Sequence, residues 1–202
     1  HSDSILGAQA FPGGGRVVTA GHDHQAIIWN ASSGEALQKL RSLDTERLMG
    51  VAVLLGGRVV ATTGSFGTVI WDVATGREWR VLVDENPTRW QHGIGIRGFP
   101  DGERLLTWNY VEAMVWNLTD GALLRRLVSV TGEVSNAALA PGGDYVVTCG
   151  NGIVAVWHVD SGLAVHSFGR RGGAQLMNGD LPRPCAVDVV VGRAADPQGL
   201  GV

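Results

Sequence analysis

The segments Val60-Ala61-Thr62-Thr63-Gly64 and Trp71-Asp72-Val73-Ala74-Thr75-Gly76 belong to a pattern that occurs four times in the chain. In each copy a Thr-containing run that ends in Gly or Asn precedes a Trp, and a Gly follows five residues after that Trp. Successive tryptophans of the pattern are 42, 45 and 41 residues apart, and a regular period of this length indicates a repeat architecture. The paired residues are Trp29 and Gly34, Trp71 and Gly76, Trp116 and Gly121, and Trp157 and Gly162.

Each copy is predicted to form four short strands. In the first copy we expect strands at about Ser4 to Phe11, Arg16 to Ala20, Ala26 to Asn30 and Glu35 to Leu40. β-branched residues fill the middles of these stretches, and Gly, Asn, Asp and Ser fill the turns between them. The turns are too short for crossover helices, so each copy should be an antiparallel meander in an all-β chain.

A four-stranded unit of this length that ends in Trp-Asp or Trp-Asn and then Gly resembles the WD40-repeat family. The resemblance covers about residues 3–168, and Trp71-Asp72 is the family dipeptide itself. It implies a radial β-propeller in which the first strand of each blade is innermost. The four implied blades are 3–40, 48–82, 92–127 and 133–168.

The chain departs from the family pattern in the turn before each third strand. The family's turn Asp is present as Asp23, but Ser65, Tyr110 and Asn151 stand in its place in the later units. The family's Gly-His pair before the first strand is not found in any unit. The buried Asp-His-Ser/Thr-Trp hydrogen-bond network of the family is therefore expected to be incomplete throughout.

The C-terminal part is expected to begin a fifth blade. Residues 169–184 show little periodicity and are predicted to be an interblade loop, and 185–202 are predicted to hold the first strand of an incomplete blade. A propeller needs a closed ring to protect its sheet edges, so the remaining blades are expected from a longer chain.

Composition excludes several classes of function. The 202 residues carry 16 basic and 19 acidic side chains without a basic stripe, which argues against nucleic acid as the partner. No apolar run approaches the roughly 20 residues of a membrane span. Cys149 and Cys185 match neither a disulfide framework nor a metal site, which favours an intracellular, cytoplasmic location.

Two groups of residues are of types that could bind a metal ion or a cofactor, and a structural role is favoured for both. His22-Asp23-His24 supplies at most three ligands, so we expect a turn in which Asp23 caps backbone amides. The repeated tryptophans occur once per unit, which indicates packing between sheets. We therefore expect no metal and no cofactor.

A propeller enzyme remains the alternative. The stretch from Asp72 to Trp79 is similar to the Trp-docking repeat of the pyrroloquinoline-quinone dehydrogenases, but the units at Ala122 and Leu163 lack the Trp after Gly. No nucleophile motif or phosphate-binding loop is present in the sequence. A truncated product without independent function is a further alternative.

The favoured function is a non-catalytic scaffold that binds a protein or peptide. Alternate turns of a meander lie on one side, so the loops between second and third strands and those between units should share one face. Aromatic residues and Arg on that face are of the kind enriched at binding hot spots, although Phe66 and Tyr110 could also pack against neighbouring turns and Trp90 could fill a gap. The candidate contact residues are His22, His24, Phe66, Arg89, Trp90, His92 and Tyr110. Trp108 should point away from the side of Thr107 and fill a gap between blades.

Overall fold

The computed structural model describes residues 1–41, 47–65, 67–83, 93–129 and 132–169 of the 202-residue chain. These residues form 16 strands in four antiparallel four-stranded sheets, each in simple chain order, which confirms the all-β prediction. The one helical element in the described ranges is a short 3-10 turn, η1 (Leu55–Gly57). No helix in the same ranges is both long and apolar enough to cross a membrane.

The strands follow the sequence pattern closely. The first sheet contains β1 (Ile5–Ala10), β2 (Arg16–Gly21), β3 (Ala26–Asn30) and β4 (Ala36–Leu40). The second contains β5 (Leu48–Leu54), β6 (Val59–Gly64), β7 (Gly67–Asp72) and β8 (Glu78–Leu82). The third contains β9 (Gly95–Gly98), β10 (Arg104–Trp108), β11 (Glu112–Asn117) and β12 (Leu123–Val128). The fourth contains β13 (Asn136–Leu139), β14 (Tyr145–Gly150), β15 (Ile153–His158) and β16 (Leu163–Gly169).

The expected interblade loop and incomplete fifth blade fall almost entirely outside the described residues. Gly169, the first residue of that expected loop, is the last residue of β16. The register of each fourth strand shifts by one residue beside the repeated Trp, so that Leu37, Trp79, Leu124 and Val165 are the extra residues.

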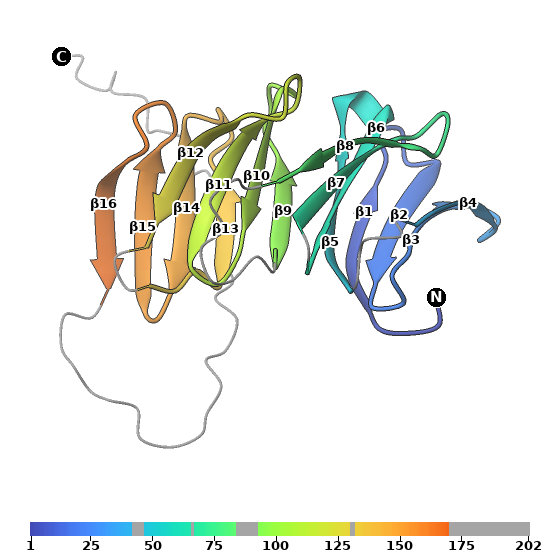
Figure 1. The fold of residues 1–202 in the computed structure, drawn as a ribbon, viewed down its shortest axis with the longest axis horizontal. Coiled ribbons are helices and arrows are strands. Elements are labelled where there is room, and N and C mark those ends of the chain that lie inside the picture. Colours follow the sequence, from blue (N-terminus) through green and yellow to red (C-terminus); the bar gives the residue numbers. More distant parts are fainter. Residues whose placement is uncertain (42–46, 66, 84–92, 130–131, 170–202) are drawn as a thin grey trace, which may run out of the picture.

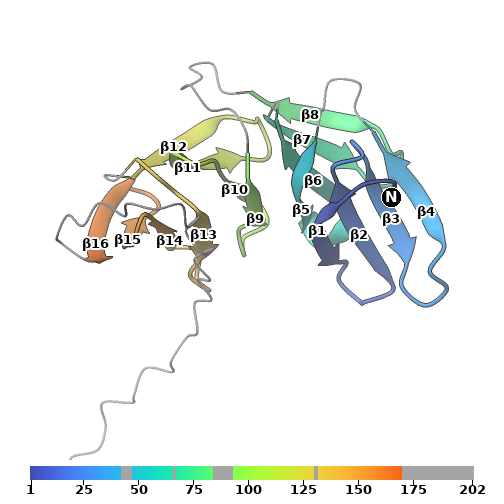
Figure 2. The ribbon, with the colours of Figure 1, turned by 90° about the horizontal axis from the view of Figure 1, so that it is seen from below.

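The four sheets stand side by side along an arc in chain order (Figures 1 and 2). Their first strands lie on the inner side of the arc, where β1 contacts β5, β5 contacts β9 and β9 contacts β13. Their fourth strands lie on the outer side. Among the residues that the structure describes, the first and fourth sheets form the two ends of the arc, and each has a neighbouring sheet on one side only (Figure 2).

Apolar side chains fill the three spaces between neighbouring sheets. The cluster between the first two sheets includes Ile28 and Leu40 with Trp71, and the next includes Ile70 and Leu82 with Trp116. The cluster between the last two sheets includes Val115 and Leu127 with Trp157. The repeated Trp of each of these sheets thus packs against the preceding sheet. Trp108 is buried in the last of these clusters, which confirms that it fills space between two sheets.

The turn after each third strand has the same backbone form. Its Gly has a positive φ of 73, 69, 78 or 68°, and its amide donates to the carbonyl of the residue after the Trp. Such a φ is costly for most side chains, which explains the constant Gly five residues after Trp. The four glycines are Gly34, Gly76, Gly121 and Gly162.

Candidate interaction surface

The turns between second and third strands lie beside the segments that lead into first strands. The amide of His22 donates to the carbonyl of Ser4 at 2.8 Å, that of Gly93 to Gly64 at 3.0 Å, and that of Val134 to Tyr110 at 2.8 Å. These bonds join the turns between second and third strands to the segments that lead into first strands, on one side of the arc. We call this side the turn face and define it by residues 22–25, 65, 109–111 and 151–152.

Three of the predicted contact residues lie on the described part of the turn face. Tyr110 is 51% exposed, whereas His22 and His24 are partly buried. The Nε2 atom of His22 is buried, and within the described residues it has no hydrogen-bond partner. Phe66, Arg89, Trp90 and His92 lie outside the described residues.

A buried polar network in the first sheet contradicts the expectation that every unit lacks one. His1 Nδ1 lies 2.8 Å from an Asp23 carboxylate oxygen, and His1 Nε2 lies 2.6 Å from the Thr19 hydroxyl. The indole Nε1 of Trp29 donates to the same hydroxyl at 2.8 Å. The side chains of His1 and Asp23 are only 3% and 2% exposed, so the network is shielded from water.

Sequence reasoning missed His1 because it searched for the pair Gly-His. The signal that could have found it is a His just before the first strand in the one unit that also has Asp23. The two ring nitrogens of His1 thus join the Asp23 carboxylate to the Thr19 hydroxyl.

The Thr–Trp part of this network recurs in all four sheets. Nε1 of Trp71 donates to Thr62 at 2.9 Å, and Nε1 of Trp116 and of Trp157 donate to Thr107 and Thr148 at 2.8 Å. These hydroxyls are the shared Thr of the sequence pattern. In the last three sheets, where the Trp is buried, the bond satisfies an indole N–H that would otherwise lack an acceptor.

Asp23 also caps the turn that contains it. Its carboxylate accepts from the amide of Ser2 at 2.9 Å and from that of Gln25 at 3.3 Å, as predicted for an Asp in this turn. His24 adopts a φ of 66° there. Among the described residues no group of three or more His, Cys, Asp or Glu side chains is arranged to hold a metal ion.

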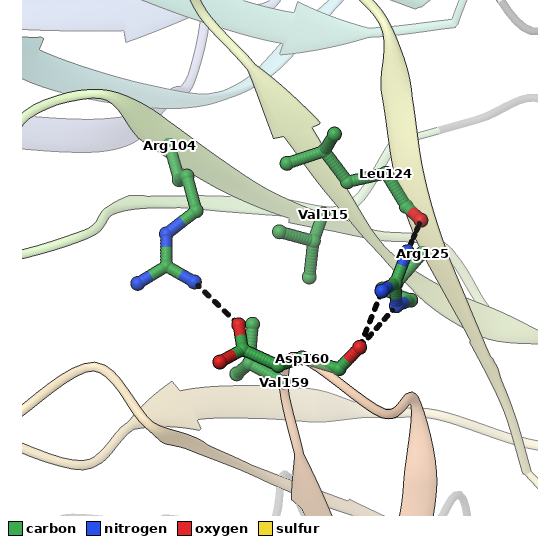
Figure 3. A pocket seen from close by; sticks show the side chains of 6 residues that line it. All are labelled: Arg104, Val115, Leu124, Arg125, Val159 and Asp160. Atoms are coloured by element: carbon green, nitrogen blue, oxygen red, sulfur yellow. Dashed lines mark hydrogen bonds and ion pairs between the residues drawn. The ribbon is translucent and has the colours of Figure 1, made fainter.

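A small cavity of about 90 Å³ lies between the third and fourth sheets (Figure 3). Its lining residues are Arg104, Val115, Leu124, Arg125, Val159 and Asp160. Nη1 of Arg104 lies 3.6 Å from the Asp160 carboxylate, and Nε of Arg125 donates to the Asp160 carbonyl at 2.8 Å. Both guanidinium groups therefore take part in contacts between the two sheets.

Two turn carboxylates are stabilised in their ionised form. Hydrogen bonds from the hydroxyl and amide of Thr75 lower the pKa of Asp72 below its usual value of 3.8. Partial burial raises the pKa of Asp101, but bonds from the amides of Glu103 and Arg104 and from the Arg104 guanidinium outweigh it and lower that pKa overall. Both carboxylates order turns.

Comparison of the chain with models of known protein families and with curated proteins finds no match.

Proposed function

We propose that the chain forms four blades of a WD40-like β-propeller and works as a non-catalytic scaffold for a protein or peptide partner. The repeated Trp-Asx-x-x-x-Gly turn of the first three units and the Thr–Trp bond of all four sheets support the family resemblance. The arc with first strands on its inner side is compatible with blades arranged around an axis.

The turn face is the proposed binding surface. The observation that carries this proposal is Tyr110, a large aromatic residue that is half exposed at the tip of a turn whose backbone is fixed. Its carbonyl accepts from Val134, and the adjacent Asn109 side chain accepts from the amides of Val111 and Glu112 at 2.8 Å. A rigid turn loses little conformational entropy on binding, and Tyr is enriched at hot spots.

Site-specific photo-crosslinking tests the proposal. A photoreactive phenylalanine analogue at position 110 should crosslink a defined partner in a cell extract, and the same analogue at Tyr145 should not. Tyr145 is a matched control because it is also an exposed Tyr but lies at the start of β14, next to the turn that joins β13 to β14.

The purified partner is then titrated by calorimetry against the chain and two variants. Tyr110→Ala should weaken binding at least about tenfold, as truncation of a hot-spot aromatic does, and Tyr145→Ala should leave it unchanged. Identical crosslinks from both positions, or equal affinities of the two variants, would show that the turn face is not the binding surface.

A further inference from the structure

In each of the first three sheets, one polar side chain of the fourth strand forms hydrogen bonds with the backbone of the next unit. Arg80 of β8 donates from Nη1 to the carbonyl of Asp120 at 2.6 Å and from Nη2 to that of Thr119 at 3.1 Å. Arg125 of β12 donates in the same way to the carbonyl of Asp160. Gln38 of β4, with its amide oriented to satisfy both neighbours, donates to Val73 and accepts from the Gly76 amide, each at 3.0 Å.

The residue two positions further along each fourth strand is apolar and covered by the next sheet. Leu40, Leu82 and Leu127 are 0%, 2% and 0% exposed. Each lies in the same cluster as the repeated Trp of the following sheet. A polar contact and a buried apolar contact thus form a fixed pair at all three junctions between sheets.

The fourth sheet presents this pair too, and no further sheet follows it within the described residues. His166 stands opposite Val156, as Arg125 stands opposite Val115, and Phe168 takes the place of Leu127. Phe168 is 59% exposed, and its ring stacks on the exposed His166 ring with 5.9 Å between their centroids. We call these two residues the donor end.

The first sheet presents the complementary half. A Cβ atom built on Gly76, Gly121 or Gly162 would lie 2.2, 2.7 or 3.1 Å from the side chain of Gln38, Arg80 or Arg125 of the preceding sheet. A Cβ atom on Gly34 would have nothing within 4 Å. The carbonyls that correspond to those of Thr119 and Asp120 belong to Ser32 and Ser33, which are exposed. We call residues 32–34, with the partly exposed Trp29 beside them, the acceptor end.

We propose that the donor end of one copy of this chain binds the acceptor end of a second copy, in the same geometry as the three internal junctions. His166 then donates to the carbonyl of Ser32, which corresponds to the Asp160 carbonyl that Arg125 uses, and Phe168 packs beside Trp29. Because the two ends lie at opposite ends of an arc, the contact is head-to-tail and, made twice, closes two copies into a ring (Figure 2).

The ends differ from the turn face in both position and chemistry. A longer chain with more units would cover them with its own sheets, but both complementary halves are present in the 202 residues themselves. The two proposals can fail separately, because Tyr110→Ala should leave the pairing intact.

Analytical ultracentrifugation of the full 202-residue chain tests the pairing with variants at each end. The unmodified chain should sediment as a dimer at micromolar concentration, and Phe168→Asp or His166→Glu should make it monomeric. Gly34→Asn should do the same, because Asn tolerates a positive φ but fills the space that His166 needs. Val165→Asp is the matched control, since this residue of β16 corresponds to Trp79 and Leu124, which stay exposed at internal junctions.

Mixing the variants tests the head-to-tail geometry. Phe168→Asp retains an acceptor end and Gly34→Asn retains a donor end, so their equimolar mixture should associate although neither does alone. A monomeric unmodified chain overturns the proposal. So does loss of the dimer in Phe168→Asp but not in Gly34→Asn, or a mixture that stays monomeric while circular dichroism shows both variants folded.

Discussion

At the scale of single residues, the Thr–Trp hydrogen bond is the polar interaction that every sheet repeats. In the fourth sheet Thr148 and Trp157 are both buried, and Trp157 lies within an apolar cluster. A buried N–H that loses its acceptor costs about 1–3 kcal/mol. We expect Thr148→Val to lower the free energy of unfolding by about that amount, measured by urea denaturation followed by circular dichroism.

Thr148→Ser is the control for this change, because it keeps the hydroxyl and removes only a methyl group. It should be more stable than Thr148→Val. Equal stability of the two variants would mean that the hydroxyl contributes through packing and not through the bond to Trp157.

The first unit shows why a residue search can miss a network that the structure completes. The bonds of Asp23 to the amides of Ser2 and Gln25 join residues distant and near in sequence, and only the nearer one follows from turn chemistry. The bond to His1 depends on how the chain enters β1. That path is set by the pairing of β1 with β2, and the motif Gly-His contains no information about this pairing.

At the scale of strands and turns, the sequence predicts most of what is observed. The expected strand Ala26 to Asn30 is observed unchanged, and the strand expected to start at Arg16 does so, because turn residues bound both. The contacts between sheets could not be predicted. The contacting position of the fourth strand is Gln38 in the first sheet and an arginine, Arg80 or Arg125, in the next two, and most of the partners are backbone carbonyls, which every residue has.

Strand β9 is shaped by the large side chain on its neighbour. Gly95 is the cross-strand partner of Trp108, and a Cβ atom on Gly95 would lie 1.9 Å from Cζ2 of that indole. We expect Gly95→Ala to lower the free energy of unfolding by about 1–3 kcal/mol, as overpacking does, measured by chemical denaturation.

A double-mutant cycle isolates this contact. In the Trp108→Ala background, where the indole is absent, Gly95→Ala should cost much less than in the unmodified chain. An unchanged cost would assign the effect to the strand backbone.

The turn after β7 is sensitive to acid because of Asp72. Its pKa in the folded chain is below 3.8, so the ionised carboxylate stabilises the fold above about pH 3.8 and this contribution is lost as the pH falls through the folded-state pKa. Asp72→Asn keeps an acceptor oxygen but not the charge. We expect a lower melting temperature for Asp72→Asn at pH 6 and a difference that shrinks toward pH 3.

Thermal scans across that range measure the difference. Because Asp72 is only partly buried, the effect should be small. Salt should reduce it only slightly, since its main cause is hydrogen bonding to Thr75. A difference that stays constant with pH would exclude the charge as its origin.

At the scale of the whole molecule, the four described sheets form a row, and the first strands make their main contacts with those of the neighbouring sheets. Within the described part of the chain, apolar clusters cover both faces of the second and third sheets but one face of the first and fourth. In such quasi-one-dimensional proteins stability is close to a sum of unit terms and junction terms. The end sheets should therefore open more readily than the middle ones.

Hydrogen exchange measured by mass spectrometry tests this gradient. Below the concentration at which copies associate, amides of β6, β7, β10 and β11 should exchange most slowly. Amides of β14 and β15 should exchange faster, by a factor that corresponds to the stabilising free energy of one junction between sheets. At higher concentration β14 to β16 and β2 to β4 should gain protection, because pairing covers both ends. Phe168→Asp should abolish this gain without changing exchange in the middle sheets. Uniform exchange from all four sheets at every concentration would instead mean that the row unfolds as one cooperative unit, whose stability does not depend on the uncovered faces.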